Sequence, residues 1–152
     1  RRLAALGDTS AIDAELTRDA SARGQLGARR ARASVPLESA KEAAWSAMFD
    51  VAVSNREFEA SAAGFWTPGQ HDVVGPWLER YVPAAIALAE QVGPGLGSRI
   101  GQAVPWLPLT VADLTHVRGA IAAACEQPLP TTLPRMWSDR VDDLTLALQI
   151  RG

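Results

Sequence analysis

Few residues of this chain are of types that perform chemistry, and their spacing does not join them into a catalytic or metal-binding motif. His71 and His116 are 45 positions apart, whereas two imidazoles that share a metal on one helix face lie four residues apart. Cys125 is the single cysteine, so the sequence contains no Cys-x-x-Cys pair. It also contains neither a Gly-x-Ser-x-Gly turn nor a Gly-Lys-Ser/Thr phosphate loop. The sequence therefore predicts no catalytic residue and no metal ligand of its own.

Two segments have compositions that bind anions in other proteins. Residues 93–98 are rich in glycine and loosely resemble a phosphate loop, but they lack its lysine and follow no predicted strand. Residues 18–32 carry five arginines against one acidic residue. Such a run suits an anion, a nucleic-acid backbone or an acidic neighbouring domain, although a solvated helix face is its more common outcome. We expect His71 to lie at a helix start and His116 at a solvent-facing or core-edge position.

Composition limits the classes of function. The chain has 152 residues, of which 47% are hydrophobic, and this suits one domain (1–152) with a real core. Its formal charge of −2 argues against nucleic acid as a partner. No apolar run approaches the ~20 residues that span a bilayer, so we expect no membrane partner. A single cysteine excludes an internal disulfide framework and favours a cytoplasmic location.

Hydrophobic residues recur at helical spacing through most of the chain, and no segment shows the sustained alternation of a strand. The predicted fold class is therefore all-α. Capping residues and a proline indicate the helix starts, the clearest being Ser54 in a capping box with Glu57. Helices are expected from Ser10, over 21–34, from Pro36, from Ser54, over 70–89, over 98–104, from Thr110 to about Glu126, and from Leu133.

Glycines and prolines indicate where these helices are interrupted. Pro76 and Pro83 lie inside the most regular stretch. Because each removes a backbone donor, we predict a break near Gly75 and a kink near Val82. Residues 93–97 are expected to form a loop, and prolines interrupt the chain again over 105–108. Residues 1–7 have the pattern of a helix end closed by Gly7, which suggests a piece of a longer protein.

The predicted helices must share a core. Connections of about 3–6 residues favour antiparallel neighbours, arranged as a bundle or as an irregular stack of antiparallel helix pairs with a HEAT- or armadillo-like superhelical form. Trp45, Trp77 and Trp137 lie on apolar stripes and are expected inside. Trp66 lies in a Pro-Gly turn, so we expect it at the surface or in an interdomain contact. Cys125 is expected to be a small buried hydrophobic residue.

Several segments, in this order, resemble the helical C-terminal domain of bacterial zinc aminopeptidases of the aminopeptidase N type. That domain is related to the C-terminal part of the endoplasmic-reticulum aminopeptidases. The resemblance covers nearly the whole chain, although 105–108 match poorly and Trp77 stands where the family tends to have Tyr. None of the segments is a catalytic signature. The segments that carry the resemblance are 12–16 with Arg18-Asp19, the Lys-x-x-x-Trp of 41–45, the Gly-Phe-x-x-x-x-Gln of 64–70, then 76–81, 133–135 and 140–144.

The resemblance implies a parent enzyme that removes N-terminal residues from peptides. In that family an upstream domain binds zinc through His-Glu-x-x-His and a distant Glu, and the zinc polarises the scissile carbonyl and activates a water. This sequence contains none of those zinc ligands. The C-terminal domain of the family covers the catalytic cleft, so the implied role is to limit the entry of substrate. The implied partners are the upstream catalytic domain of the same chain and the peptide substrate.

The resemblance also suggests contact residues. Arginine holds a peptide carboxylate through two parallel hydrogen bonds, and Arg80 and Arg135 are the candidates for such a contact. Trp66 and Gln70 are candidates for a contact between domains. Two other classes of function remain open at this stage. One is a free-standing helical-repeat module that binds a protein, and the other is a nucleic-acid module that uses residues 18–32, with salt-sensitive binding.

Overall fold

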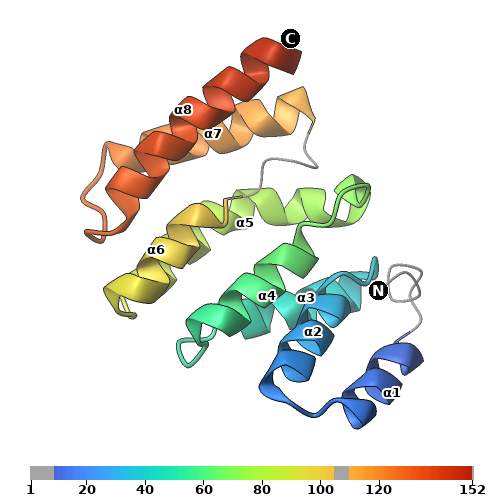
Figure 1. Ribbon diagram of the computed structural model, residues 1–152. Coiled ribbons are helices and arrows are strands. Elements are labelled where there is room, and N and C mark those ends of the chain that lie inside the picture. Colours follow the sequence, from blue (N-terminus) through green and yellow to red (C-terminus); the bar gives the residue numbers. More distant parts are fainter. Residues whose placement is uncertain (1–8, 105–109, 152) are drawn as a thin grey trace. The chain divides into compact units, whose positions relative to one another are not determined.

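The structure, a computed structural model, describes residues 9–104 and 110–151 (Figure 1). Within these residues the chain forms helices and no strand, which confirms the all-α prediction. None of the described helices is long and apolar enough to cross a membrane. The helices are α1 (Ser10–Arg18), α2 (Ala22–Ala33), α3 (Glu38–Met48), α4 (Asn55–Phe65), α5 (His71–Ala89), α6 (Pro94–Gln102), α7 (Val111–Cys125) and α8 (Leu133–Arg151).

The chain divides into two compact units, Arg1–Val74 and Gly75–Gly152, which are called the N-terminal and C-terminal units below. The boundary falls inside α5. In the N-terminal unit α1 to α4 pack as antiparallel neighbours in sequence order, and in the C-terminal unit α8 packs against α6 and against its antiparallel neighbour α7 (Figure 1). That residues 1–152 act as one domain stays a prediction. The predicted helix end over 1–7 and the interruption over 105–108 lie outside the described residues.

The core of the N-terminal unit is built around a cluster of aromatic rings. Trp45 on α3 lies 4.5 Å from the ring centroid of Phe49 and 5.5 Å from that of Phe65. Phe58 meets Phe49 edge-on at 6.2 Å. Aromatic pairs at these separations contribute about 0.5–1.5 kcal/mol each beyond their buried area. The cluster holds α3 against α4, and α2 packs against both of these helices.

Capping explains the start of α4 but not that of α1. Ser54 Oγ accepts a hydrogen bond from the backbone N–H of Glu57, and the Glu57 carboxylate accepts one from the Ser54 N–H. The predicted capping box is therefore confirmed. Helix α1 begins at Ser10, as expected, but Ser10 is its first helical residue and not its cap, because Thr9 occupies the N-cap position without a side-chain cap bond.

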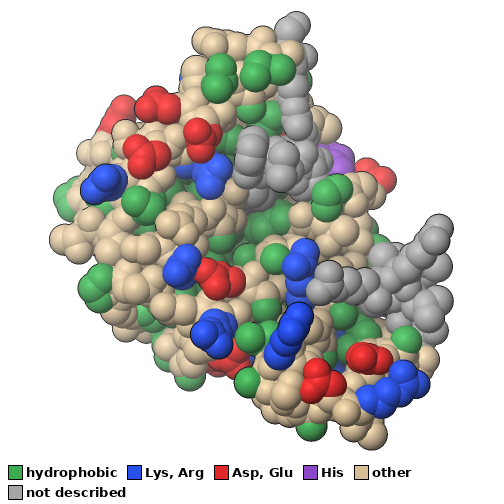
Figure 2. Space-filling view, viewed as in Figure 1, with side chains coloured by type: hydrophobic (Ala, Val, Ile, Leu, Met, Phe, Trp, Pro, Cys, Tyr) green, Lys and Arg blue, Asp and Glu red, His purple; other side chains and the backbone are tan. Residues whose placement is uncertain are grey.

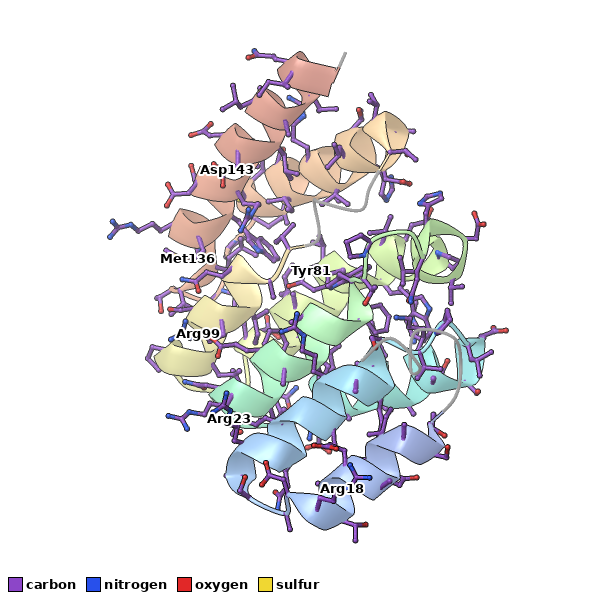
Figure 3. The ribbon with its side chains drawn as sticks, turned by 45° about the vertical axis from the view of Figure 1, so that its right-hand side comes forward. Arg18, Arg23, Tyr81, Arg99, Met136 and Asp143 are labelled. Carbon is purple, nitrogen blue, oxygen red and sulfur yellow. The ribbon has the colours of Figure 1, made fainter. Side chains whose placement is uncertain are left out.

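The C-terminal unit depends on a close approach of α6 and α8. A Cβ atom on Gly97 would collide with the Thr132 hydroxyl, and one on Gly101 would lie 2.7 Å from the Met136 Cβ. The two glycines are four residues apart and let α8 lie against the α6 backbone. Figure 3 marks Met136 on α8 and Tyr81 on α5. The Tyr81 hydroxyl is buried and donates to the Ile100 carbonyl at 2.7 Å, which joins α5 to α6.

Helix α6 also corrects an expectation about residues 93–97. They were predicted to form a loop, but Gly93 is the N-cap and Pro94 occupies the first turn of α6. Proline suits this position because the first N–H groups of a helix have no intrahelical partner. Of the glycines that suggested a loop, Gly97 is required by the close contact of α6 with the start of α8.

Helix α5 continues through both of its prolines, so the predicted break near Gly75 is wrong. Pro76 and Pro83 are seven residues apart, which places them on the same side of the helix, and both are exposed. The carbonyls that lose their donors belong to Asp72 and Glu79, which are exposed as well. Water can therefore hydrogen-bond to these carbonyls, and the apolar face of α5 keeps its helical hydrogen bonds.

We expect Pro83→Ala to raise the free energy of unfolding by about 1–2 kcal/mol, because alanine restores the donor to the Glu79 carbonyl. Urea unfolding followed by circular dichroism measures the change. The control Pro68→Ala lies in the exposed turn before α5, where proline only restrains the unfolded chain, and no gain is expected. A loss of stability in Pro83→Ala would contradict this account of α5.

We expect Gly101→Ala to lower the free energy of unfolding by about 1–3 kcal/mol, because the new methyl group overlaps Met136. The matched control is Gly119→Ala on α7. A Cβ there meets nothing within 4 Å, so alanine should stabilise the helix by about 0.5–1 kcal/mol. Urea unfolding of the two variants should give opposite signs. Equal shifts would show that α6 and α8 do not approach closely at Gly101.

Candidate functional site

Trp66 lies inside the N-terminal unit, so the expectation of a surface position was wrong. It is 9% exposed, occupies the C-cap of α4 and meets the Phe65 ring edge-on at 4.8 Å. The turn that follows explains why. Thr67 Oγ1 donates to the Gly64 carbonyl, and Gly69 adopts a φ of 81° that glycine tolerates without strain. The turn thus ends α4 tightly and turns the indole toward the core.

Gln70 belongs to the same turn and is also 9% exposed. Its Nε2 donates to the Ser34 carbonyl at 2.8 Å, which ties the start of α5 to the C-cap of α2. Within the described residues this side chain has a structural partner in its own unit. The proposed interdomain role of Trp66 and Gln70 stays a prediction.

Arg80 and Arg135 lie in the C-terminal unit, so the four predicted contact residues are divided between the two units. Arg80 is exposed on α5, and its guanidinium lies 4.3 Å from the centroid of the Trp77 ring. This is the geometry of a cation–π contact. Arg135 is exposed in the first turn of α8. Contact of these arginines with a peptide stays a prediction.

Lys41 is the functional candidate that sequence reasoning missed. It is the single lysine in the chain and is fully buried, at 0% exposure. The sequence spacing does indicate that Lys41 is buried, because Lys41 precedes the buried Trp45 and Met48 by four and seven residues and so shares their face of α3. Charged side chains on such a face are normally paired or hydrogen-bonded.

The Lys41 ammonium binds the ends of two helices. Its Nζ donates to the carbonyl of Ala33, the last residue of α2, at 2.7 Å, and to that of Phe65, the last residue of α4, at 2.9 Å. It also lies 5.1 Å from the centroid of the Phe65 ring. The last carbonyls of a helix lack intrahelical donors and carry its negative end charge. One cation therefore satisfies two helix ends, and α2 and α4 must end side by side.

Burial lowers the pKa of Lys41 from its ordinary 10.5 to about 8, because the buried ammonium has lost its hydration. The sign of the consequence follows from linkage. Between pH 8 and 10.5 the unfolded chain holds a proton at Lys41 that the folded chain has released, so a rise in pH favours the folded state. Buried Tyr81, whose pKa is raised by desolvation, acts in the opposite direction only above about pH 10.

We expect the free energy of unfolding to rise by about 1–2 kcal/mol between pH 8 and 9.5, through Lys41 alone. Urea unfolding at each pH measures it. Partial desolvation also raises the pKa of Cys125, so the series is run in a Cys125→Ser background. The matched variant Lys41→Met should lack the rise. If the Cys125→Ser protein that retains Lys41 instead lost stability between pH 8 and 9.5, the lowered pKa of Lys41 would be contradicted.

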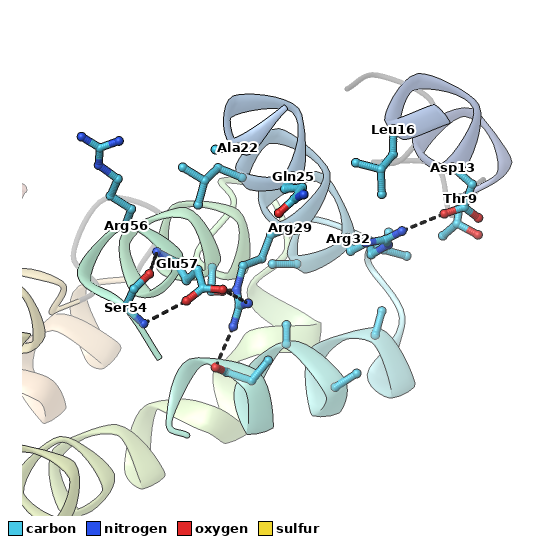
Figure 4. A pocket seen from close by; sticks show the side chains of 18 residues that line it. Thr9, Asp13, Leu16, Ala22, Gln25, Arg29, Arg32, Ser54, Arg56 and Glu57 are labelled. Carbon is cyan, nitrogen blue, oxygen red and sulfur yellow. Dashed lines mark hydrogen bonds and ion pairs between the residues drawn. The ribbon is translucent and has the colours of Figure 1, made fainter. Parts of the chain in front are cut away.

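A groove with a volume of about 880 Å³ opens in the N-terminal unit (Figure 4). One of its walls is a row of alanines from α3, spaced so that they share one face. The other lining residues come from α1, α2 and α4 and from the residues next to these helices, and they include Leu16, Leu26 and Arg29. The alanines are Ala40, Ala43, Ala44 and Ala47.

Arg29 and Arg32 are the arginines of α2 that line this groove, and both have partners within the unit. Arg29 donates to Ser61 Oγ at 2.8 Å, to the Ala47 carbonyl at 2.9 Å and to Glu57 Oε1 at 3.3 Å. Arg32 forms an ion pair with Asp13 at 2.8 Å. Because these guanidinium groups are already bound, the groove offers mainly apolar surface. Its described lining contains no histidine or cysteine that would act as a base or nucleophile.

The remaining titratable residues of interest lie apart from this groove. His71 is half-buried at the start of α5, as expected, and His116 is exposed on α7. Cys125 is exposed rather than buried, because it is the last residue of α7 and lies beyond the buried face that ends at Ile121. Within the described residues, no three His, Cys, Asp or Glu side chains are grouped so that they could hold a metal ion.

The basic run over 18–32 is distributed through the N-terminal unit rather than gathered at one site. Arg18 pairs with Glu15 at 3.4 Å within α1, and Arg29 and Arg32 have the carboxylate partners already described. The face in Figure 2 shows acidic and basic side chains interspersed. This arrangement is typical of a solvated surface, and the run itself does not identify a partner.

Comparison with known proteins gives a partial match. No model of a known protein family matches the chain. The chain is 36% identical over 107 residues to aminopeptidase N of Streptomyces lividans. The aligned part is 63% of this chain and 12% of that protein, so the chain corresponds to a small part of the relative's length. This all-α chain is thus similar to a portion of an aminopeptidase N.

Proposed function

We propose that this chain is a non-catalytic helical part of a zinc metallo-aminopeptidase of the aminopeptidase N type. The observation that carries the proposal is the 36% identity over 107 residues to the Streptomyces protein. The order of the segments that resemble the C-terminal domain of that family agrees with it. Because the match covers 12% of the relative, the activity and substrates of a whole aminopeptidase belong to the proposal.

In this proposal the chemistry lies outside these residues. Zinc in such an enzyme polarises the scissile carbonyl and activates a water. The His-Glu-x-x-His motif that would hold it does not occur in this sequence, and the described residues form no alternative metal group. The residues present therefore do not fit a zinc site, and no step of hydrolysis is assigned to them. The proposed setting is cytoplasmic, with the upstream catalytic domain as the partner.

The proposed role is to cover the catalytic cleft and limit the size of the peptide that enters. Antiparallel helix pairs in both units support a stacked arrangement of the HEAT or armadillo kind. Such stacks bind along an extended face, which suits a cover over a cleft. Arg80, stacked on Trp77, and Arg135 are the proposed contacts for the peptide, with Trp66 and Gln70 near the partner domain.

The experiment compares this chain with the longer natural chain that contains it, on aminoacyl chromogenic substrates, with and without a chelator. We expect activity only in the longer chain, abolished by the chelator and restored by zinc. The control replaces the first His of the upstream His-Glu-x-x-His by Ala, which should remove activity without affecting the helices.

If the longer chain showed no peptidase activity and contained no His-Glu-x-x-His upstream, the proposal would be overturned. The free-standing helical-repeat module would then be the function to pursue, with the alanine-walled groove of the N-terminal unit as its first candidate surface. Activity of the 152-residue chain alone would contradict the non-catalytic role.

A further inference from the structure

The folded chain carries its single side-chain amine in a closed site. The other 14 of its 15 cationic residues are arginines, which amine-directed acylation does not modify. Lys41 is 0% exposed, and its ammonium donates to two main-chain carbonyls, one at the end of α2 and one at the end of α4. An acyl donor in solvent therefore has no access to the nitrogen while the N-terminal unit is closed.

Opening of the N-terminal unit exposes the Lys41 nitrogen to the acyl donor and releases it from its two carbonyl acceptors. The exposed ammonium loses a proton to solvent, and the nitrogen lone pair attacks the carbonyl carbon of an activated ester. A C–N bond forms, the bond between that carbon and the leaving oxygen breaks, and the second amine proton goes to solvent as the amide forms. The product amide is neutral and carries one N–H.

The acylated side chain no longer fits the closed site. The ammonium donates hydrogen bonds to both the Ala33 and the Phe65 carbonyl. The single N–H of the amide can donate to only one of them, and the other carbonyl is left buried without a donor. The acyl group also adds at least three heavy atoms at a position with no exposed surface. Overpacking and an unsatisfied carbonyl both oppose closure.

We propose that Lys41 is a conditional modification site, acylated only when the N-terminal unit opens, and that its acylation then prevents the unit from closing. The co-reactant is an activated acyl ester. The proposal rests on Lys41, its two carbonyl acceptors and its burial, and it is independent of the proposed peptidase function.

The test treats the natural protein with N-hydroxysuccinimidyl acetate, in buffer and in urea. An arginine-specific digest releases residues 33–56, and mass spectrometry of this fragment measures acetylation of Lys41. Arg18→Lys supplies the matched control, because the side chain at position 18 is 76% exposed. In buffer we expect Lys41 to react on the order of 100-fold or more slowly than the amine introduced by Arg18→Lys, and at a similar rate in urea.

The second measurement follows refolding after the urea and reagent are removed. Protein acetylated in urea should fail to regain the native near-ultraviolet circular dichroism, whereas Lys41→Met, treated identically, should regain it. If in buffer the acetylation rate of Lys41 lay within 10-fold of that of the Arg18→Lys amine, the proposal that Lys41 reacts only in the opened unit would be overturned. Full recovery of the acetylated protein would overturn the block on closure. If Lys41→Met does not fold, protein exposed to urea without reagent is the refolding control.

Discussion

The N-terminal unit depends on the requirement that a buried ammonium be fully hydrogen-bonded. Lys41 reaches this state only where the last carbonyls of α2 and α4 lie together, so these two helices must run in the same direction and end at the same level. The Phe65 ring lies beside the charge, and Gln70 binds the C-cap of α2 close to the same end. A buried charge contributes little net stability, but it excludes arrangements in which either helix end moves away.

The packing of the C-terminal unit depends on two glycines, which have no side chain, rather than on a buried charge. Gly97 and Gly101 allow α8 to contact the backbone of α6, and the buried Tyr81 hydroxyl fixes the Ile100 carbonyl of the same helix. Arg140 on α8 donates to the Gln102 carbonyl at the end of α6. One unit therefore satisfies helix ends with a lysine in its core, whereas the other uses close packing and a charged residue at the edge of the contact.

Local signals in the sequence predicted most of the helices, because capping and apolar spacing act within a few residues. The capping box at Ser54 and the cap at Thr110 are examples. Features that depend on distant partners were not predictable. Gly97 looks like a loop residue until α8 is placed against it, and the role of Lys41 depends on two carbonyls 8 and 24 residues away. The candidate site was predicted less well than the fold for this reason.

The two prolines of α5 bear on the curvature of that helix. Both lie on the exposed side, two turns apart, and a proline lengthens the side of the helix on which it sits. Bends at the two prolines would therefore add in one direction instead of cancelling, with the exposed side of the helix convex. Prolines placed nine residues apart would lie on opposite sides of the helix, so their bends would oppose each other. In this helix, the seven-residue spacing of the prolines favours one direction of bending, in which the apolar face is concave.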